Sequence, residues 1–326
     1  TIEGAGTVGL EIAEDWPEVE VVLFPTGGRS LFRSEVSGID REANRQRVRD
    51  SAFALVRIFY TLTAVQTVLL MLAGLSWFDA LTHAFATLAT GGLSPRGASV
   101  AYFDSWLVEA IIVVFMLAGG LNFAYYDACV RLGPRKALRM ALDSSEVRTY
   151  LGLLFCSTVL ISVALWFWGG SNGTANGLPD YRSFLLCVRD ASFNVVNLNA
   201  TCGFTQADFD LWPDFCRALL MVLIMIGPCA GSTGGGLKMI RSLIVFKAAV
   251  RGVRRFARPR AIYPLRVDGQ TLDESVVASV TGFFAMWMIV TVASSLAISA
   301  LGFDIVTAAT SVIATLNNAG PGLGIV

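Results

Sequence analysis

The sequence predicts an all-α integral membrane protein built from repeated units, each with an outer helix, a short re-entrant helix, a glycine loop and an inner helix. Three observations predict this fold class. The 326 residues are 54% hydrophobic and only 15% charged, whereas soluble domains are about 25% charged. Several apolar stretches are long enough to cross a bilayer, which takes about 20 helical residues. Shorter apolar segments that end in glycine-containing tetrads recur between those stretches.

Five stretches are predicted to be membrane helices. Four of them are continuous: Ala52–Leu75, Trp106–Val130, Tyr150–Trp168 and Val276–Leu301. The fifth, Trp212–Val250, is interrupted near its middle by the ten residues 227–236, five of which are glycine. A regular helix cannot continue cheaply through so many glycines. Irregular backbone at membrane depth is tolerated only where it lines a cavity or is buried in protein. The interruption is therefore predicted to be functional.

The distribution of charge predicts the orientation in the membrane. Seven arginines lie from Arg29 to Arg57, five cations from Arg131 to Arg148 and nine from Lys238 to Arg266, which together are 21 of the 25 lysines and arginines. If the helices alternate in direction, all three groups lie on one side of the membrane. Cytoplasmic loops carry an excess of cations. These three basic linkers are therefore predicted to be cytoplasmic.

Three short segments lie between the predicted membrane helices and start on the outer side. They are Asp79–Thr90, Ser183–Thr201 and Asp304–Asn318, and the first residue of each is a plausible N-cap. Each ends in a tetrad that contains glycine. The tetrads are Thr90-Gly91-Gly92-Leu93, Thr201-Cys202-Gly203-Phe204 and Asn318-Ala319-Gly320-Pro321. A pattern that repeats at a long, nearly fixed period decides the fold.

The spacing of the tetrads predicts an incomplete set of repeats. Gly92 and Gly203 are 111 residues apart, and Gly203 and Gly320 are 117 apart. The candidate for an earlier copy is Ile2-Glu3-Gly4-Ala5, and Gly4 lies only 88 residues before Gly92. The shortfall is about the length of one membrane helix. We therefore expect a fold that is incomplete at both ends, with a first and a fourth repeat that lack their inner helices.

This pattern has the chemistry of a cation pathway. A short helix that enters from outside and ends in mid-membrane points the negative end of its dipole at the centre. A glycine loop can then turn its carbonyl groups inward, because glycine tolerates positive φ and has no side chain. Four such loops around one axis replace the hydration shell of a cation with carbonyl oxygens, as in potassium channels. The three clear tetrads contain no carboxylate, which argues against a ring selective for divalent ions.

Other functional classes fit less well. Equal numbers of cations and anions, 25 of each, argue against nucleic-acid binding. The single histidine, His83, rules out a multi-histidine metal site and is expected to serve in packing or hydrogen bonding. Gly4–Gly9 matches G-x-G-x-x-G but has no preceding strand, and in 231–238 Leu237 breaks the spacing of a phosphate loop. Because the sequence shows no candidate nucleophile–base pair, we expect neither an enzyme nor an organic cofactor.

Five segments resemble the Trk/Ktr/HKT family of potassium transporters, and most closely its bacterial TrkH branch. They are 27–35 (GGRSLFRSE), 87–94 (TLATGGLS), 199–205 (NATCGFT), 231–238 (GSTGGGLK) and 317–324 (NNAGPGLG). The resemblance covers nearly everything from residue 27 to 326. It implies potassium uptake across the bacterial inner membrane, with the tetrads as the K⁺ selectivity filter and glycine in every loop for potassium preference. The alternative is a truncated or regulatory subunit that does not conduct.

The resemblance also implies a gate and partners. The gate is the intramembrane loop beneath the filter, formed by Gly231, Ser232, Thr233, Gly234, Gly235 and Gly236 and followed by Lys238. The implied assembly is a homodimer in lipid with one pore per protomer, regulated by a cytoplasmic nucleotide-binding ring of the TrkA type.

The sequence divides into five regions on this interpretation. Residues 1–26 are the remnant of the first repeat, 27–51 a cytoplasmic linker, 52–147 the second repeat, 148–266 the third repeat with its broken inner helix and basic linker, and 267–326 the fourth repeat.

Overall fold

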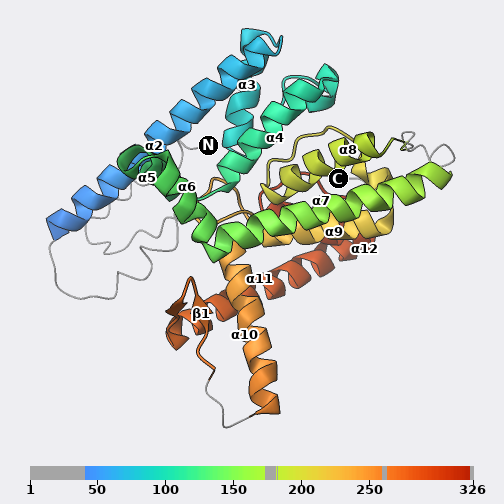
Figure 1. Cartoon of the computed structure of the whole chain (residues 1–326). Coiled ribbons are helices and arrows are strands. Elements are labelled where there is room, and N and C mark those ends of the chain that lie inside the picture. Colours follow the sequence, from blue (N-terminus) through green and yellow to red (C-terminus); the bar gives the residue numbers. More distant parts are fainter. Residues whose placement is uncertain (1–40, 173–180, 182, 259–262, 324–326) are drawn as a thin grey trace.

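The computed structural model describes residues 41–172, 181, 183–258 and 263–323, and Figure 1 shows the arrangement of its helices. The longer helices are α2 (Arg41–Leu72), α3 (Trp77–Leu88), α4 (Trp106–Gly120), α5 (Ala124–Leu132), α6 (Pro134–Asp143), α7 (Ser145–Asn172), α8 (Phe184–Asn199), α9 (Asp214–Ile226), α10 (Met239–Ala257), α11 (Glu274–Ala300) and α12 (Ile305–Leu316). Two short 3₁₀ segments, Ser99–Phe103 and Phe209–Leu211, and a hairpin of β1 (Arg266–Val267) and β2 (Gln270–Thr271) join them. The predicted all-α class is confirmed.

Three helices in the described part of the chain are long and apolar enough to cross a membrane. They contain the segments Leu55–Leu72 in α2, Ser145–Trp168 in α7 and Glu274–Ala300 in α11. These segments match three of the four continuous helices that the sequence predicts. They are the outer helices of the three predicted repeats that the structure describes.

The fourth predicted helix, Trp106–Val130, is not continuous. Helix α4 ends at Gly120, and α5 departs from it at 91°. Two hydrogen bonds hold the bend: the side chain of Asn122 accepts from the Ala124 N–H (2.9 Å), and the Phe123 N–H donates to the carbonyl of Gly231 in a distant segment (3.0 Å). The prediction of one straight span was therefore wrong, because hydropathy does not register a bend that hydrogen bonds to another segment impose.

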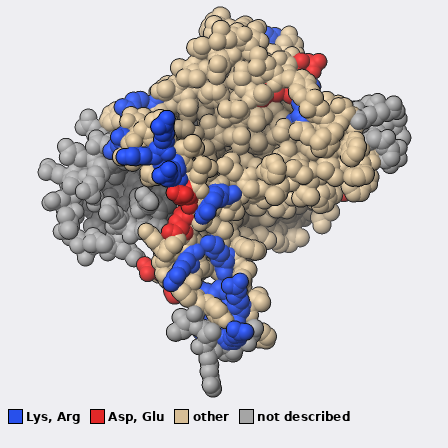
Figure 2. Space-filling model, viewed as in Figure 1, with Lys and Arg blue, Asp and Glu red and all other residues tan. Residues whose placement is uncertain are grey.

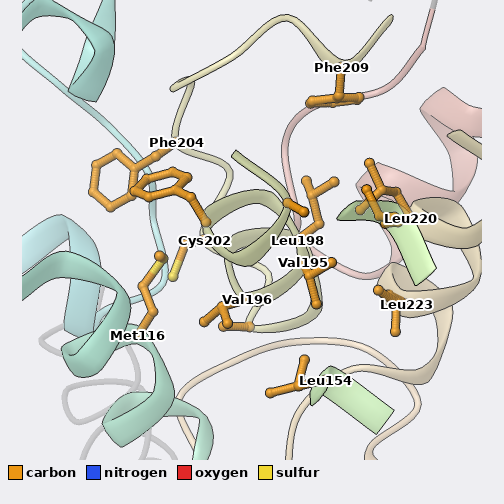
Figure 3. Packing of buried hydrophobic residues seen from close by; sticks show 14 of the residues in the cluster. Met116, Leu154, Val195, Val196, Leu198, Cys202, Phe204, Phe209, Leu220 and Leu223 are labelled. Atoms are coloured by element: carbon orange, nitrogen blue, oxygen red, sulfur yellow. The ribbon is translucent and has the colours of Figure 1, made fainter. Parts of the chain in front are cut away.

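The packing repeats along the chain. Each outer helix contacts the short helix that follows it, so that α2 packs on α3, α7 on α8 and α11 on α12. Each inner helix then contacts the next short helix, α4 against α8 and α9 against α12. Helix α8 lies in the middle of this series and is buried along most of its length. Figure 3 shows the consequence: Met116 of α4 lies near Cys202, and Leu220 and Leu223 of α9 lie on the side of Val195 and Leu198.

The short helices begin close to the predicted N-caps, with one correction. Asp304 accepts hydrogen bonds from the N–H groups of Val306 and Thr307, and Ser183 is the cap residue of α8. The first short helix is capped by Ser76 rather than by Asp79, because the Ser76 hydroxyl accepts from the Asp79 N–H (3.1 Å). The Ser76 hydroxyl in turn donates to the carboxylate of Asp79 (2.9 Å), which has a second partner that is described below.

The charged side chains gather as predicted for a protein with one basic side. Figure 2 shows lysines and arginines concentrated over the region of α5, α6 and α10, whereas most of the remaining visible surface is uncharged. On α10 and α11, Arg251 forms a two-pronged ion pair with Glu274 (2.6 and 3.0 Å). The hairpin also packs here, in a small cluster formed by Ile244, Val267 and Val277 with Leu265.

Candidate functional site

Three loops that follow the short helices share one backbone conformation. The first residue of each tetrad is left-handed: φ is 52° at Thr90, 56° at Thr201 and 54° at Asn318. The glycine two positions later also has positive φ. These angles are 59° at Gly92, 85° at Gly203 and 88° at Gly320. The expected need for glycine at the third position is therefore met in all three loops.

Hydrogen bonds at the helix ends explain this conformation. The N–H of the second tetrad residue reaches back to a carbonyl of the last helical turn: Gly91 to Ala86 (2.9 Å), Cys202 to Asn197 (2.9 Å), and in the third loop Ala319 to Ala314 (2.8 Å). This six-residue closure with a left-handed residue inside it is the Schellman motif. The left-handed position usually takes glycine, and another residue there costs about 1–2 kcal/mol. Sequence reasoning missed this strain at Thr90, Thr201 and Asn318, although their position directly after a short helix repeats three times.

The three loops lie against one another through their backbones. A Cβ atom added to Gly92 would lie 2.1 Å from the carbonyl oxygen of Cys202, and one added to Gly203 would lie 2.3 Å from that of Ala319. By contrast, a Cβ at Gly91 or Gly320 would have nothing within 4 Å. The structure thus brings three of the four predicted loops together. The fourth, Ile2-Glu3-Gly4, lies outside the described residues.

A buried polar side chain ties each loop back to its own short helix. Asn197 donates to the carbonyl of Phe204 (2.7 Å) and accepts from its N–H (2.9 Å). In the loop after α12, the hydroxyl of Thr310 accepts from the Leu323 N–H (3.0 Å). After α3, His83 donates through Nδ1 to the carbonyl of Asp79 (2.7 Å), which leaves Nε2 to accept from the Ser94 hydroxyl (3.0 Å). His83 thus has the hydrogen-bonding surroundings that the sequence predicts, whereas the clamps at Asn197 and Thr310 were not predicted.

The segment between α9 and α10, residues 227–238, contains the predicted interruption at 227–236 and lies directly against these loops. The N–H of Gly235 donates to the Thr201 hydroxyl (2.8 Å), and the Thr90 hydroxyl donates to the carbonyl of Thr233 (3.3 Å). A Cβ atom on Gly235 would lie only 2.0 Å from the carbonyl oxygen of Asn317. The interruption therefore touches the ends of all three short helices.

The bend between α4 and α5 supports the interruption from a second side. The Cys229 N–H donates to the carbonyl of Gly120 (3.0 Å), and the Thr233 hydroxyl donates to that of Gly119 (3.3 Å). A Cβ on Gly120 would lie 2.4 Å from the hydroxyl of Tyr150, so this glycine also permits close packing. Two inner helices are thus broken where they meet, and their breaks satisfy each other's backbone groups.

Lys238 ends the interruption and turns back onto it. Its backbone is left-handed, with φ at 72°. Its ammonium group donates to the carbonyl of Ser232 (3.5 Å), to the hydroxyl of Ser232 (3.3 Å) and to the carbonyl of Gly234. Lys238 thus binds two of the predicted gate residues, Ser232 and Gly234.

Ion pairs lie near the N-terminal ends of the short helices. Arg96 forms a two-pronged pair with Asp79 (3.1 and 2.7 Å), and its hydrogen bond holds the pKa of Asp79 below the ordinary value. Arg189 of α8 pairs in the same way with the buried Glu109 of α4 (2.7 and 2.5 Å). The second pair joins one repeat to the next. Four of the 25 cations lie in the predicted outer segments, and these two are among them.

Comparison with known proteins gives a consistent result. A family model named TrkH and described as a cation transport protein matches residues 19–326. The Trk system potassium uptake protein TrkH of Escherichia coli (strain K12) is 38% identical over 305 residues, 93% of this chain and 60% of that protein. The protein of the same name in Halomonas elongata is 35% identical over 308 residues, 93% of this chain.

A solved structure is similar as well. The crystal structure of the potassium transporter TrkH from Vibrio parahaemolyticus matches with a TM-score of 0.79 and 36% identity, covering 89% of this chain and 58% of that one. The chain thus spans about 60% of the length of the relatives that it matches.

Proposed function

This chain belongs to the TrkH family of cation transport proteins, and on that premise we propose that it takes up potassium across the bacterial cytoplasmic membrane. The family is one of membrane transporters rather than enzymes, which agrees with the apolar composition and the membrane-capable helices. The observation that carries the proposal is the set of three loops with one shared backbone conformation, in contact through their carbonyl groups.

The proposed selectivity filter consists of the backbone carbonyls of the three tetrads, with Ile2, Glu3 and Gly4 as the candidate fourth loop. Carbonyl oxygens at fixed positions replace the hydration shell of a cation. The Schellman endings and the clamps at Asn197, Thr310 and His83 support this role, because they hold the loop backbones to rigid helices. Potassium is the transported ion in this proposal, and glycine at the third position of every loop goes with potassium preference.

The proposed gate is the segment from Gly231 to Gly236, closed by Lys238. Its contacts with Thr90, Thr201 and Asn317 support a position on the ion path directly below the filter. Its high glycine content supports movement, since glycine has the most backbone conformations to regain on release. In the closed state the ammonium of Lys238 is hydrogen-bonded to carbonyl groups that a passing cation would otherwise contact.

The proposed partners follow from the basic side of the molecule. The second basic linker and most of the third lie within the described residues, over α5, α6 and α10, and they suit the docking of a cytoplasmic nucleotide-binding ring of the TrkA type. We propose a homodimer in lipid with one pore per protomer. We propose the domain division with repeats at 52–147, 148–266 and 267–326, and the packing of α2 on α3, α7 on α8 and α11 on α12 supports it.

A transport assay tests the proposal. A bacterium that lacks its own potassium uptake systems should grow on low potassium when it expresses the protein, because uptake restores the cytoplasmic ion. Purified protein in vesicles should pass potassium faster than sodium. If the protein reaches the membrane but neither supports growth nor passes potassium, the result would favour a non-conducting subunit on the same scaffold.

A further inference from the structure

We propose that Glu146 is a positioning residue that holds the segment 227–238 in its closed conformation. This inference rests on the proposed gating function of that segment. The observation behind it is a buried carboxylate at the start of α7 that binds a backbone N–H of the interruption, 84 residues further along the chain.

The burial of Glu146 needs an explanation. The residue lies in the first turn of α7, where a negative charge is stabilised by the helix dipole without having to leave water. Yet only 6% of Glu146 is exposed. Its Oε1 accepts from the Ala230 N–H at 2.6 Å. A buried carboxylate is tolerated only when it is well hydrogen-bonded, so the bonds to the Ala230 N–H of the interruption and to the Ile240 N–H of α10 account for the position of this side chain.

The first N–H of α7 has a partner other than Glu146. The N–H of Ser145 has no partner within the helix, but it donates to the carboxylate of Asp268 in the hairpin between β1 and β2 (2.6 Å). Glu274 occupies the corresponding first turn of the outer helix α11, but its side chain is 76% exposed and pairs with Arg251. The difference between these two glutamates shows that a first-turn position alone does not bury a carboxylate.

The interruption is held between two opposite charges. Its backbone has no helical partners over this stretch, so its N–H and carbonyl groups must find others. Glu146 accepts from the N–H at Ala230, and Lys238 donates to the carbonyls of Ser232 and Gly234. Glu146 and Lys238 also attract each other electrostatically. The anion and the cation thus compensate each other where water is scarce.

The connection has a direct consequence for opening. If the segment is to leave the ion path, the Ala230 N–H has to leave the carboxylate, and the buried Glu146 then loses one of its two backbone hydrogen bonds, the other being with the Ile240 N–H in the first turn of α10. Hydrogen bonds to charged groups are among the stronger ones in proteins. Removing the carboxylate should therefore favour the open state and leave the filter unchanged.

The experiment measures potassium efflux from vesicles that contain the protein without any cytoplasmic partner. Glu146→Ala should raise the efflux roughly tenfold, a size expected from the loss of one charged hydrogen bond. Glu146→Gln keeps an acceptor oxygen and should bring the efflux most of the way back. The ratio of potassium to sodium permeability should stay at its wild-type value in both variants, since Glu146 does not touch the tetrads. Glu274→Ala is the matched control and should change neither quantity.

Three outcomes would overturn the inference. One is a Glu146→Ala protein that elutes and melts like the wild type and shows wild-type efflux. Another is a Glu146→Gln protein as leaky as Glu146→Ala. If the Glu146→Ala protein does not reconstitute, Glu146→Asp tests the same hydrogen bond, because the shorter side chain withdraws from Ala230. Wild-type efflux from the Glu146→Asp protein would be the third outcome that overturns the inference.

Deleting residues 231–236 separates this inference from the proposed function. If the deletion raises the efflux and Glu146→Ala does not, the gating function of the segment is supported and the proposed role of Glu146 is contradicted. If no variant, including the deletion, passes potassium, the proposed function fails and the inference fails with it.

Discussion

Two constraints, one on backbone conformation and one on space, require glycine at positions 92 and 203. Both residues have positive φ, which disfavours any residue with a side chain. Both also face the carbonyl group of the neighbouring loop so closely that a Cβ atom has no room. Gly91 lies beside Gly92 but is under neither constraint, since its φ is not positive and its Cβ would meet open space. The two neighbours therefore differ in what they tolerate.

This difference gives a prediction at the scale of single residues. Gly92→Ser should lower the ratio of potassium to sodium permeability about tenfold, since a side chain in the left-handed region costs about 1–2 kcal/mol and has to displace the Cys202 carbonyl. Gly91→Ser is the control and should leave the ratio close to the wild-type value. Ion flux through reconstituted vesicles measures both variants. Equal ratios of potassium to sodium permeability in the two variants would contradict the assignment of the third-position carbonyls to the filter.

The sequence predicts the backbone conformation of the loop glycines but not that of the residues next to them. Positive φ at Gly92, Gly203 and Gly320 follows from residue type and position. Positive φ at Thr90 and Thr201 does not, because threonine is a poor residue for that region and only the hydrogen bonds of the helix end impose it. Nor does a sequence show that Asn197 reaches the backbone of Phe204, since that contact depends on the path of the loop.

At the scale of elements, the two broken inner helices show what composition can and cannot reveal. The break after α9 is predictable, because five glycines in ten residues are incompatible with a regular helix. The bend after α4 is not, because the apolar run continues to Val130. It arises from contacts with a distant segment, in which Phe123 bonds to Gly231 and Cys229 bonds to Gly120.

The interruption itself gives a prediction at this scale. Deleting residues 231–236 should raise potassium flux, since the deletion removes the groups that contact Thr90, Thr201 and Asn317 below the loops. The measurement is potassium efflux from vesicles at matched protein content. Gly252→Ala in α10, where a Cβ would meet nothing within 4 Å, is a control that should not change the flux. A folded deletion variant with unchanged or lower flux would contradict a gating role.

At the scale of the whole molecule, the most predictable property was its asymmetry. Net charge is zero, but 21 of the 25 cations fall in three linkers. The repeat was predictable as well, because its tetrads recur at separations of 111 and 117 residues. What the sequence did not reveal is how the repeats join. That depends on contacts between segments far apart in the chain, such as the pair of Arg189 with Glu109.

The orientation can be tested directly. Leu138 on α6 and Tyr102 in the segment before α4 are both exposed, at 61% and 56%, and they lie on opposite sides in the predicted orientation. In intact cells, a maleimide that cannot cross membranes should label Tyr102→Cys and spare Leu138→Cys. Both should be labelled after the membranes are opened. The wild-type protein supplies the background from its own six cysteines. Labelling of Leu138→Cys alone in intact cells would reverse the assigned topology.

The ordering of the glycine-rich interruption has a thermal consequence. Fixing one residue in a single backbone conformation costs about 1–2 kcal/mol of entropy at 25 °C, and glycine loses the most. The segment 227–236 contains five glycines, all held in place. Release of the segment exchanges hydrogen-bond enthalpy for backbone entropy, so warming favours the released form. The conductance of such a protein should rise with temperature more steeply than the diffusion of ions through a permanently open channel.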